Sequence, residues 1–195
     1  MALTPSTMLA LGTPAPDFSL PEVRTGKDIS LKSFEEKKPL LVMFICRHCP
    51  YVVHVQEELS KIGRDYFPDK IGIVAVSAND AEKYPDDAPS KLKQMAEALG
   101  FAFPYCHDAS QETAKAYKAA CTPDFFLFDG SRKLVYRGQL DDSRPGNGKP
   151  VTGRDLRQAI DSVLSGRPAA GDQTPSLGCN IKWKQGLEPA YFPGA

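Results

Sequence analysis

The chain has 195 residues, 42% hydrophobic and 25% charged, which is typical of one globular domain with a tail. Its 24 Lys and Arg equal its 24 Asp and Glu, so no net field attracts nucleic acid or anionic lipid. No apolar run approaches the ~20 residues that cross a bilayer, and residues 1–11 lack the parts of a signal peptide. We therefore expect a cytoplasmic protein with neither nucleic acid nor membrane as partner.

The first half of the chain predicts a hairpin followed by a β-α-β unit. Residues 17–20 and 29–31 alternate apolar and polar side chains, which indicates a β-hairpin. The continuous apolar runs 40–45 and 71–76 are typical of strands covered on both faces. Between them, residues 50–66 carry apolar side chains at helical spacing. The two strands should therefore be parallel and joined by a right-handed crossover.

The second half predicts a β-β-α unit and an irregular tail. We expect a helix over 92–99, a short strand over 101–105 and a helix capped by Ser110. Strands over 125–128 and 134–137 should follow, joined by a tight turn at Asp129-Gly130. The last helix should begin at its cap Thr152 and end at Gly166. Residues 1–166 are thus interpreted as one domain. Residues 167–195, rich in Gly and Pro, are interpreted as a tail packed on it.

This order of elements, with a cysteine pair where the first helix opens, resembles the thioredoxin fold. In detail the chain is similar to a peroxiredoxin-like branch of that superfamily, related to alkyl hydroperoxide reductase and thiol-specific antioxidant proteins but with a Cys-x-x-Cys motif. The similarity is carried by Cys-Arg-His-Cys-Pro-Tyr-Val at 46–52, Thr-Pro-Asp-Phe-Phe-Leu-Phe-Asp at 122–129, Tyr-Arg-Gly-Gln-Leu-Asp-Asp at 136–142, and Gly178 to Lys184. The resemblance implies an α/β fold, a central mixed sheet flanked by helices, with an N-terminal β-hairpin extension and an irregular C-terminal tail.

Cys46 and Cys49 are the predicted catalytic residues. Five cysteines, an odd number, do not form a disulfide framework. At a helix N-terminus the free N–H groups and the dipole favour a thiolate, and the spacing lets the two sulfurs bridge. We expect an exposed Cys46 to attack a partner disulfide and Cys49 to resolve the mixed disulfide. The alternative is a pair of inert core cysteines.

Two neighbouring pairs of residues are expected to modulate this site. Arg47 and His48 can stabilise a thiolate and raise the reduction potential, although His48 is equally well explained as a solvated loop residue. In the family that the chain resembles, a cis-proline faces the cysteines, and Pro123 takes that place. The backbone of Thr122 would then pair with a peptide substrate as a strand does. A trans proline that begins a strand is the alternative.

The remaining cysteines have weaker assignments. Cys106 and Cys121 are interpreted as small buried hydrophobic residues, and Cys121 is also a candidate accessory thiol. Cys179 precedes Ile181 and Trp183, which alternate with lysines as in a docked strand. Cys179 is the second candidate accessory thiol.

The predicted function is therefore thiol–disulfide exchange with protein or small-molecule thiols and disulfides, using no organic cofactor and no metal. Thioredoxin's buried acid is replaced here by Leu40, so the proton of Cys49 needs another route. A peroxiredoxin-like thiol peroxidase acting on peroxide is one alternative, but Cys46 replaces the Thr or Ser that would orient the peroxide. A redox-inactive binding module is another alternative. A metal site using Cys46, Cys49, His48 and His54 is disfavoured, because the chain has no second ligand pair.

Overall fold

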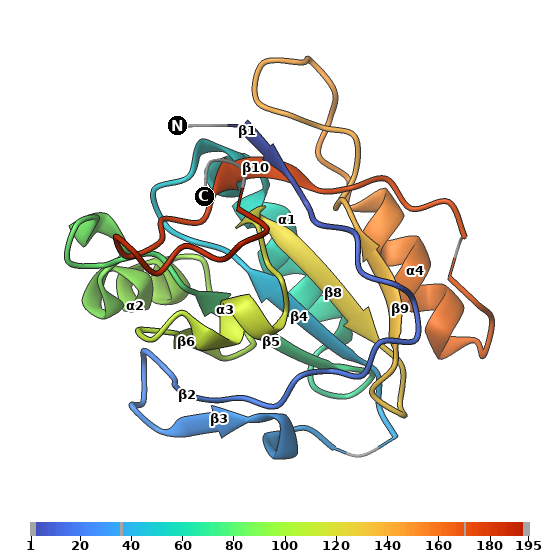
Figure 1. The fold of residues 1–195 in the computed structure, drawn as a ribbon. Helices are drawn as coiled ribbons and strands as arrows, with labels where there is room; N and C mark the ends of the chain where they lie inside the picture. Colours follow the sequence, from blue (N-terminus) through green and yellow to red (C-terminus); the bar gives the residue numbers. More distant parts are fainter. Residues whose placement is uncertain (1–2, 36, 170, 193–195) are drawn as a thin grey trace.

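The computed structural model describes residues 3–35, 37–169 and 171–192. A five-stranded sheet in the order β6-β5-β4-β8-β9 lies at its centre (Figure 1). Its strands are β4 (Leu40–Phe44), β5 (Gly72–Ser77), β6 (Tyr105–His107), β8 (Asp124–Phe128) and β9 (Leu134–Gly138). β4, β5 and β6 are parallel, whereas β8 runs antiparallel to both β4 and β9. The predicted mixed sheet and its parallel β-α-β unit are confirmed.

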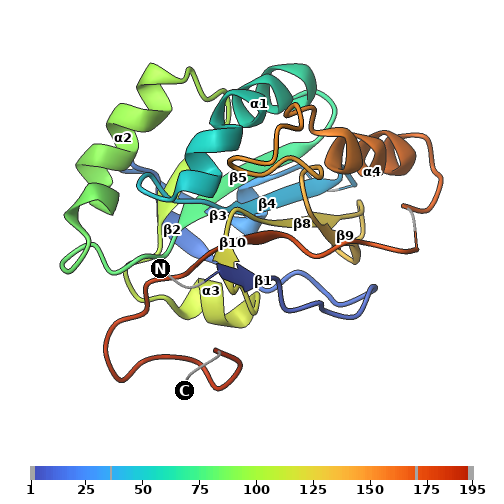
Figure 2. The same cartoon turned by 90° about the horizontal axis from the view of Figure 1, so that it is seen from above.

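Helices and a hairpin cover the two faces of this sheet (Figure 2). One face carries α1 (Pro50–Tyr66), α2 (Pro89–Ala98) and α4 (Arg154–Leu164). The other face carries α3 (Glu112–Ala116) and the hairpin of β2 (Ser19–Pro21) and β3 (Asp28–Ser30). Two short 3-10 helices lie in the connections, Leu31–Ser33 after β3 and Pro85–Asp87 between β5 and α2.

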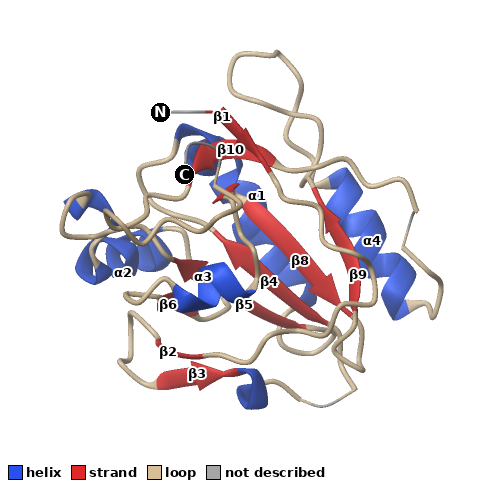
Figure 3. Cartoon of the chain, viewed as in Figure 1, coloured by secondary structure: helices blue, strands red, loops and turns tan. Residues whose placement is uncertain are grey.

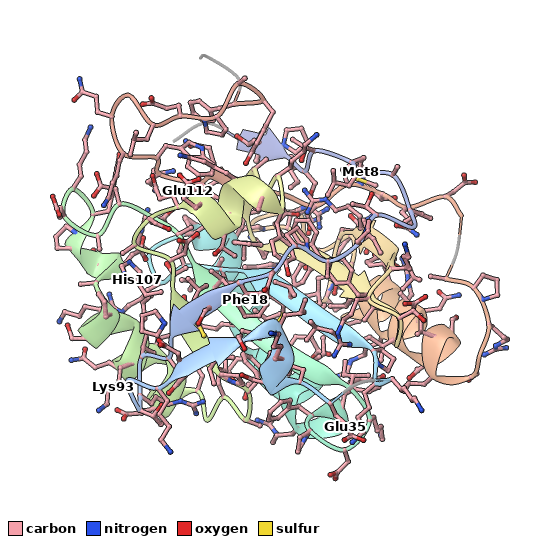
Figure 4. The ribbon with its side chains drawn as sticks, turned by 60° about the horizontal axis from the view of Figure 1, so that its bottom comes forward. Met8, Phe18, Glu35, Lys93, His107 and Glu112 are labelled. Carbon is pink, nitrogen blue, oxygen red and sulfur yellow. The ribbon has the colours of Figure 1, made fainter. Side chains whose placement is uncertain are left out.

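The strand β4 shows why the sheet is central, because all five of its residues are buried. Leu41 and Met43 pack against the helical layer. The alternate residues Leu40, Val42 and Phe44 pack against the hairpin side. A strand buried on both faces needs the continuous apolar run that the sequence has. In Figure 4, Phe18 lies over the sheet on the hairpin side, and Lys93 lies at the rim of the molecule.

Two helix caps differ from the prediction. The residue before α3 is Gln111, with φ 66°, not Ser110. Similarly, Gly153 with φ 66°, not Thr152, precedes α4. In both cases the expected cap lies one residue too early. Its hydroxyl accepts a hydrogen bond from the first helical N–H, 3.2 Å from Ser110 and 3.3 Å from Thr152. In each case one residue with a left-handed backbone conformation, Gln111 or Gly153, separates the residue that carries this hydroxyl from the helix.

Two β features also differ. The predicted strand 101–105 is displaced to Tyr105–His107, because pairing with β5 begins only at Tyr105, while Phe101 and Phe103 are buried in the helical layer. The predicted tight turn at Asp129-Gly130 is a longer loop. Asp129 and Lys133 are hydrogen-bonded across it, and Arg132 adopts a left-handed conformation with φ 59°.

The tail contains a docked strand, as its alternating pattern predicts, but the strand begins before Cys179 and ends at Asn180. β10 (Leu177–Asn180) lies between β1 (Leu3–Pro5) and β7 (Cys121–Thr122) in a second sheet, antiparallel to both (Figure 3). Trp183 is buried as expected, but Lys182 is also buried, with its ammonium group donating to Asn180. Residues 1–2, 36, 170 and 193–195 of the predicted domain and tail lie outside the described residues. Among the helices that are described, none has the length and apolarity needed to cross a bilayer.

Candidate functional site

The cysteine pair lies where β4 leads into α1. Cys46 follows the strand, and Cys49 is the N-cap of the helix. The Tyr105 hydroxyl fixes the turn by donating to the Ile45 carbonyl at 3.2 Å. Both cysteines are free thiols, but they are only 1% and 0% exposed. The expectation that Cys46 is exposed is therefore wrong.

Thr122 contacts both sulfurs from the opposite side. Its hydroxyl lies 3.3 Å from the Sγ of Cys46, and its carbonyl oxygen lies 3.2 Å from the Sγ of Cys49. The peptide bond between Thr122 and Pro123 is cis, as predicted. The residue before the cis-proline and the cysteine pair thus form one compact cluster, and its contacts to the two sulfurs come from two different atoms of Thr122.

The hydrogen bond between the two cysteines distributes their charge unevenly. Donation from Cys46 lowers the pKa of Cys49 to about 4, with further donors at Thr122 and Cys179 outweighing burial. The same hydrogen bond, burial and the nearby Asp87 carboxylate raise the pKa of Cys46 well above its usual value. The sequence analysis expected the thiolate on Cys46. The structure favours it on Cys49, because the Asp87 carboxylate lies beside Cys46, although the Thr122 carbonyl oxygen beside Cys49 is an acceptor.

Asp87 is a buried acid that the sequence analysis missed. It ends the 3-10 helix Pro85–Asp87 and is 0% exposed. One of its oxygens accepts from the backbone N–H groups of Arg47 and His48, at 2.7 and 3.3 Å. The other accepts from the Asn79 amide at 2.7 Å and contacts the His48 ring. Burial opposes its ionisation, but these hydrogen bonds outweigh it and lower the pKa of Asp87.

The two residues between the cysteines are both paired with acids. The hydrogen bond to Asp87 raises the pKa of His48, whose ring also stacks on Tyr84 at 5.7 Å between centroids. The Arg47 guanidinium lies 3.0 Å from the Asp86 carboxylate. Neither side chain is simply solvated. The positive charge of His48 is balanced by Asp87, which is itself close to Cys46.

The tail covers the edge at which a peptide substrate was expected. Cys179 of β10 is the pairing partner of Thr122, so that edge is already occupied by the chain itself. Burial and the neighbouring Cys49 raise the pKa of the Cys179 thiol to about 12, and both cysteines belong to the same buried cluster. Cys121, one residue from Thr122, turns its thiol toward the Pro123 carbonyl at 3.6 Å. Cys106 lies in the core on the other side of the sheet, as a buried hydrophobic residue would.

One group of side chains has the composition of a metal site. Ligand atoms of Cys46, His48 and Asp87 lie within 4.8 Å of one another. The Asp87 oxygens, however, already accept the hydrogen bonds described above, and an ion would have to replace them. His54, which the sequence analysis weighed as a ligand, is hydrogen-bonded to Ser143 at 2.8 Å. The internal hydrogen bonds account for these residues without a metal.

Comparison with known proteins places the chain in a family. The family model described as AhpC/TSA matches residues 11–137, which include both cysteines and the cis-proline. The chain belongs to the AhpC/TSA family. No match to a curated protein was found.

Several solved structures are similar to the chain along most of its length. An uncharacterized conserved protein from Geobacillus kaustophilus is 52% identical, with a TM-score of 0.92 over 95% of this chain and 98% of its own. A hypothetical protein from Sinorhizobium meliloti 1021 is 50% identical, with a TM-score of 0.91 over 94% and 100%. A thiol:disulfide interchange protein of the thioredoxin family from Chlorobium tepidum TLS is 18% identical, with a TM-score of 0.61 over 80% and 99%. The last likeness shows that the fold is thioredoxin-like.

Proposed function

We propose that this protein is a thiol–disulfide oxidoreductase whose Cys46 and Cys49 cycle between two thiols and a disulfide. The observation that carries the proposal is the buried cluster in which Thr122 contacts both sulfurs and the Asp87 carboxylate lies beside Cys46. In this cluster the pKa of Cys49 is lowered to about 4. A thiolate is the nucleophile in disulfide exchange. The buried, hydrogen-bonded sulfurs beside a cis-proline are therefore more than inert core residues.

The charge distribution sets the order of the reaction. The Cys49 thiolate attacks a partner disulfide, forms a mixed disulfide and releases one partner thiol. Cys46 then attacks the Cys49 sulfur, releases the second partner thiol and leaves the Cys46–Cys49 disulfide. Cys46 must lose its proton in this step, and Asp87 with His48 is the buried acid–base pair beside it. Leu40 takes the place of thioredoxin's buried acid and cannot accept a proton, so the Asp87–His48 pair supplies the proton-transfer route instead. In this mechanism the proton comes from Cys46, whereas the sequence analysis expected it to come from Cys49.

The order of attack is tested by trapping. Cys46→Ser combined with Cys179→Ser should accumulate mixed disulfides with protein or small-molecule partners through Cys49, because neither neighbouring thiol is left to resolve them. Cys49→Ser should not. The opposite pattern would restore Cys46 as the nucleophile, as the sequence analysis expects. Absence of the Cys46–Cys49 disulfide from the oxidised wild type would contradict the proposed function itself.

A thiol peroxidase is the second candidate, and the lowered pKa of Cys49 at the start of a helix is the observation that favours it. The Thr or Ser that would orient a peroxide is replaced by Cys46. We therefore expect hydrogen peroxide to be turned over slowly in stopped-flow assays. A rate like that of an efficient peroxidase would make peroxide the main substrate.

A further inference from the structure

We propose that Cys179, in the tail strand β10, is a third redox-active cysteine that exchanges disulfide bonds with Cys49. The inference rests on the proposed function and extends it, because it adds a second intramolecular partner for the same sulfur. Cys49 is then the common member of two disulfides, one with Cys46 and one with Cys179.

The first support is the position of Cys179 in the site. In the register of β7 and β10, Cys179 lies directly opposite Thr122, the residue that contacts both sulfurs of the pair. Burial and the neighbouring Cys49 raise the pKa of the Cys179 thiol to about 12. Cys179 is 5% exposed and belongs to the same buried cluster as Cys46 and Cys49. Three cysteines of one buried cluster are therefore neighbours of Thr122.

The second support is that the tail is fixed on both sides of Cys179. Before it, a Cβ on Gly178 would lie 2.0 Å from the Thr122 carbonyl oxygen, so only glycine lets the strands approach this closely. After it, the N–H of Ile181 donates to the Ala120 carbonyl at 3.1 Å. The N–H of Lys182 donates to the Asn79 side chain at 2.8 Å.

This tail anchor at Asn79 is shared with the acid of the site. Asn79 accepts from the Lys182 backbone through its oxygen and donates to Asp87 through its amide group, at 2.7 Å. The segment that carries Cys179 is thus hydrogen-bonded through one side chain to the carboxylate beside Cys46. The tail therefore contributes directly to the structure of the site.

The exchange balances without another reactant. Starting from the Cys46–Cys49 disulfide, the Cys179 sulfur attacks the Sγ of Cys49. The Cys46–Cys49 bond breaks, the Cys49–Cys179 bond forms, and the proton of the Cys179 thiol passes to the departing Cys46 sulfur. One disulfide and one thiol are present before and after, so there is no net oxidation.

The two disulfides have different consequences for the tail. When Cys49 is joined to Cys46, β10 is held to β7 by non-covalent contacts alone and can separate from it. When Cys49 is joined to Cys179, β10 is covalently held over Thr122. The edge that a peptide substrate would pair with is then closed. The position of the disulfide thereby selects between an accessible and a covered site.

Disulfide mapping of the native protein tests this proposal. The three cysteines fall on different tryptic peptides: Cys46 on 38–47, Cys49 on 48–61 and Cys179 on 158–182. The protein is oxidised with glutathione disulfide, its remaining thiols are blocked with N-ethylmaleimide, and the digest is analysed by mass spectrometry. Circular dichroism and the thermal midpoint of each variant show that it is folded.

In the wild type we expect both cross-links of peptide 48–61, to 38–47 and to 158–182. Cys46→Ser should retain the 48–61 to 158–182 link as its main product. Cys106→Ala is the matched control, because this buried cysteine lies in the other core cluster, and it should give the wild-type pattern.

If folded Cys46→Ser gives only a glutathione adduct on Cys49, with Cys179 blocked as a free thiol, the proposal is overturned. Cys46→Ala is a second variant that should give the same result as Cys46→Ser if the serine hydroxyl has no influence. Cys179→Ser separates the two hypotheses. It should still form the 38–47 to 48–61 link, and failure to do so would contradict the proposed function instead.

Discussion

A single methyl group on Gly178 should open the covered cysteine pair. In Gly178→Ala the new Cβ would lie 2.0 Å from the Thr122 carbonyl oxygen and 2.7 Å from its carbon. Such atoms do not approach within 3.0 Å of each other, so the strand must retreat by about 1 Å. Backbone hydrogen bonds have a normal length of about 2.7–3.2 Å and weaken steeply beyond it. The pairing of β10 with β7 should therefore be lost.

The size of the effect follows from the short ladder. β7 and β10 pair through two residue pairs, Cys179 with Thr122 and Asn180 with Cys121. Losing two hydrogen bonds at about 0.5–1.5 kcal/mol each makes opening of the tail easier by about 1–3 kcal/mol. That corresponds to a roughly 5- to 150-fold larger open population. Alkylation of the buried thiols requires the open state, so its rate should rise by the same factor.

The assay is the rate of iodoacetamide labelling of Cys46 and Cys49 in the native protein, read by mass spectrometry. Gly171→Ala is the matched control, because it lies in the same tail and a Cβ there meets no atom within 4 Å. This control should be labelled at the wild-type rate. A folded Gly178→Ala protein that is labelled no faster than wild type would refute the argument that β10 limits access.

Three further predictions concern charge. The ultraviolet absorbance of the thiolate should persist at neutral pH and disappear as the pH falls through about 4, the pKa of Cys49; a midpoint above neutral pH would contradict the charge assignment. His48→Ala should make the cysteine couple more reducing, because a positive imidazole favours the thiolate form. Its reduction potential should fall by about 30 mV for each 1.4 kcal/mol of thiolate stabilisation lost. Equilibration with glutathione measures the potential, and an unchanged value would show that His48 has no influence on it. Asp124→Asn breaks a fully buried ion pair with Arg137 and should lower the free energy of unfolding in urea by about 3–5 kcal/mol. Asp142→Asn removes an exposed ion pair and should leave that free energy unchanged; equal effects of the two variants would contradict the reasoning.

The parts of the fold that the sequence predicted are those with a strong local pattern. The continuous apolar run of β4 and the helical spacing in α1 each specify an element without reference to the rest of the chain. Because the cysteine pair lies between these two elements, its place at the helix start could be predicted as well. Pro123 was predictable in the same way, from the strand that follows it and from the family resemblance.

The parts that were missed depend on contacts between distant segments. Asp87 lies in a polar loop flanked by prolines, and nothing in that loop indicates that it folds over the start of α1. The burial of Cys46 could not be predicted either, because its sulfur is surrounded by segments distant in sequence, Thr122 and Asp87 among them. The distribution of charge between Cys46 and Cys49 depends on both the loop that carries Asp87 and the tail that carries Cys179. A local helix-dipole argument assigned the thiolate to Cys46 because it included neither Asp87 nor Cys179.

The pairing of β10 with both β1 and β7 also has a consequence for biosynthesis. β1 contributes residues 3–5 and β7 residues 121–122, and β10 is the last strand of the described chain to leave the ribosome. Pairings so distant in sequence form late, since a long loop must close before they are gained. The β4–α1–β5 unit precedes the tail by about a hundred residues, so the nascent domain displays its two thiols before their cover has been translated. Until then, the thiols are open to the oxidants and disulfides of the surrounding solution.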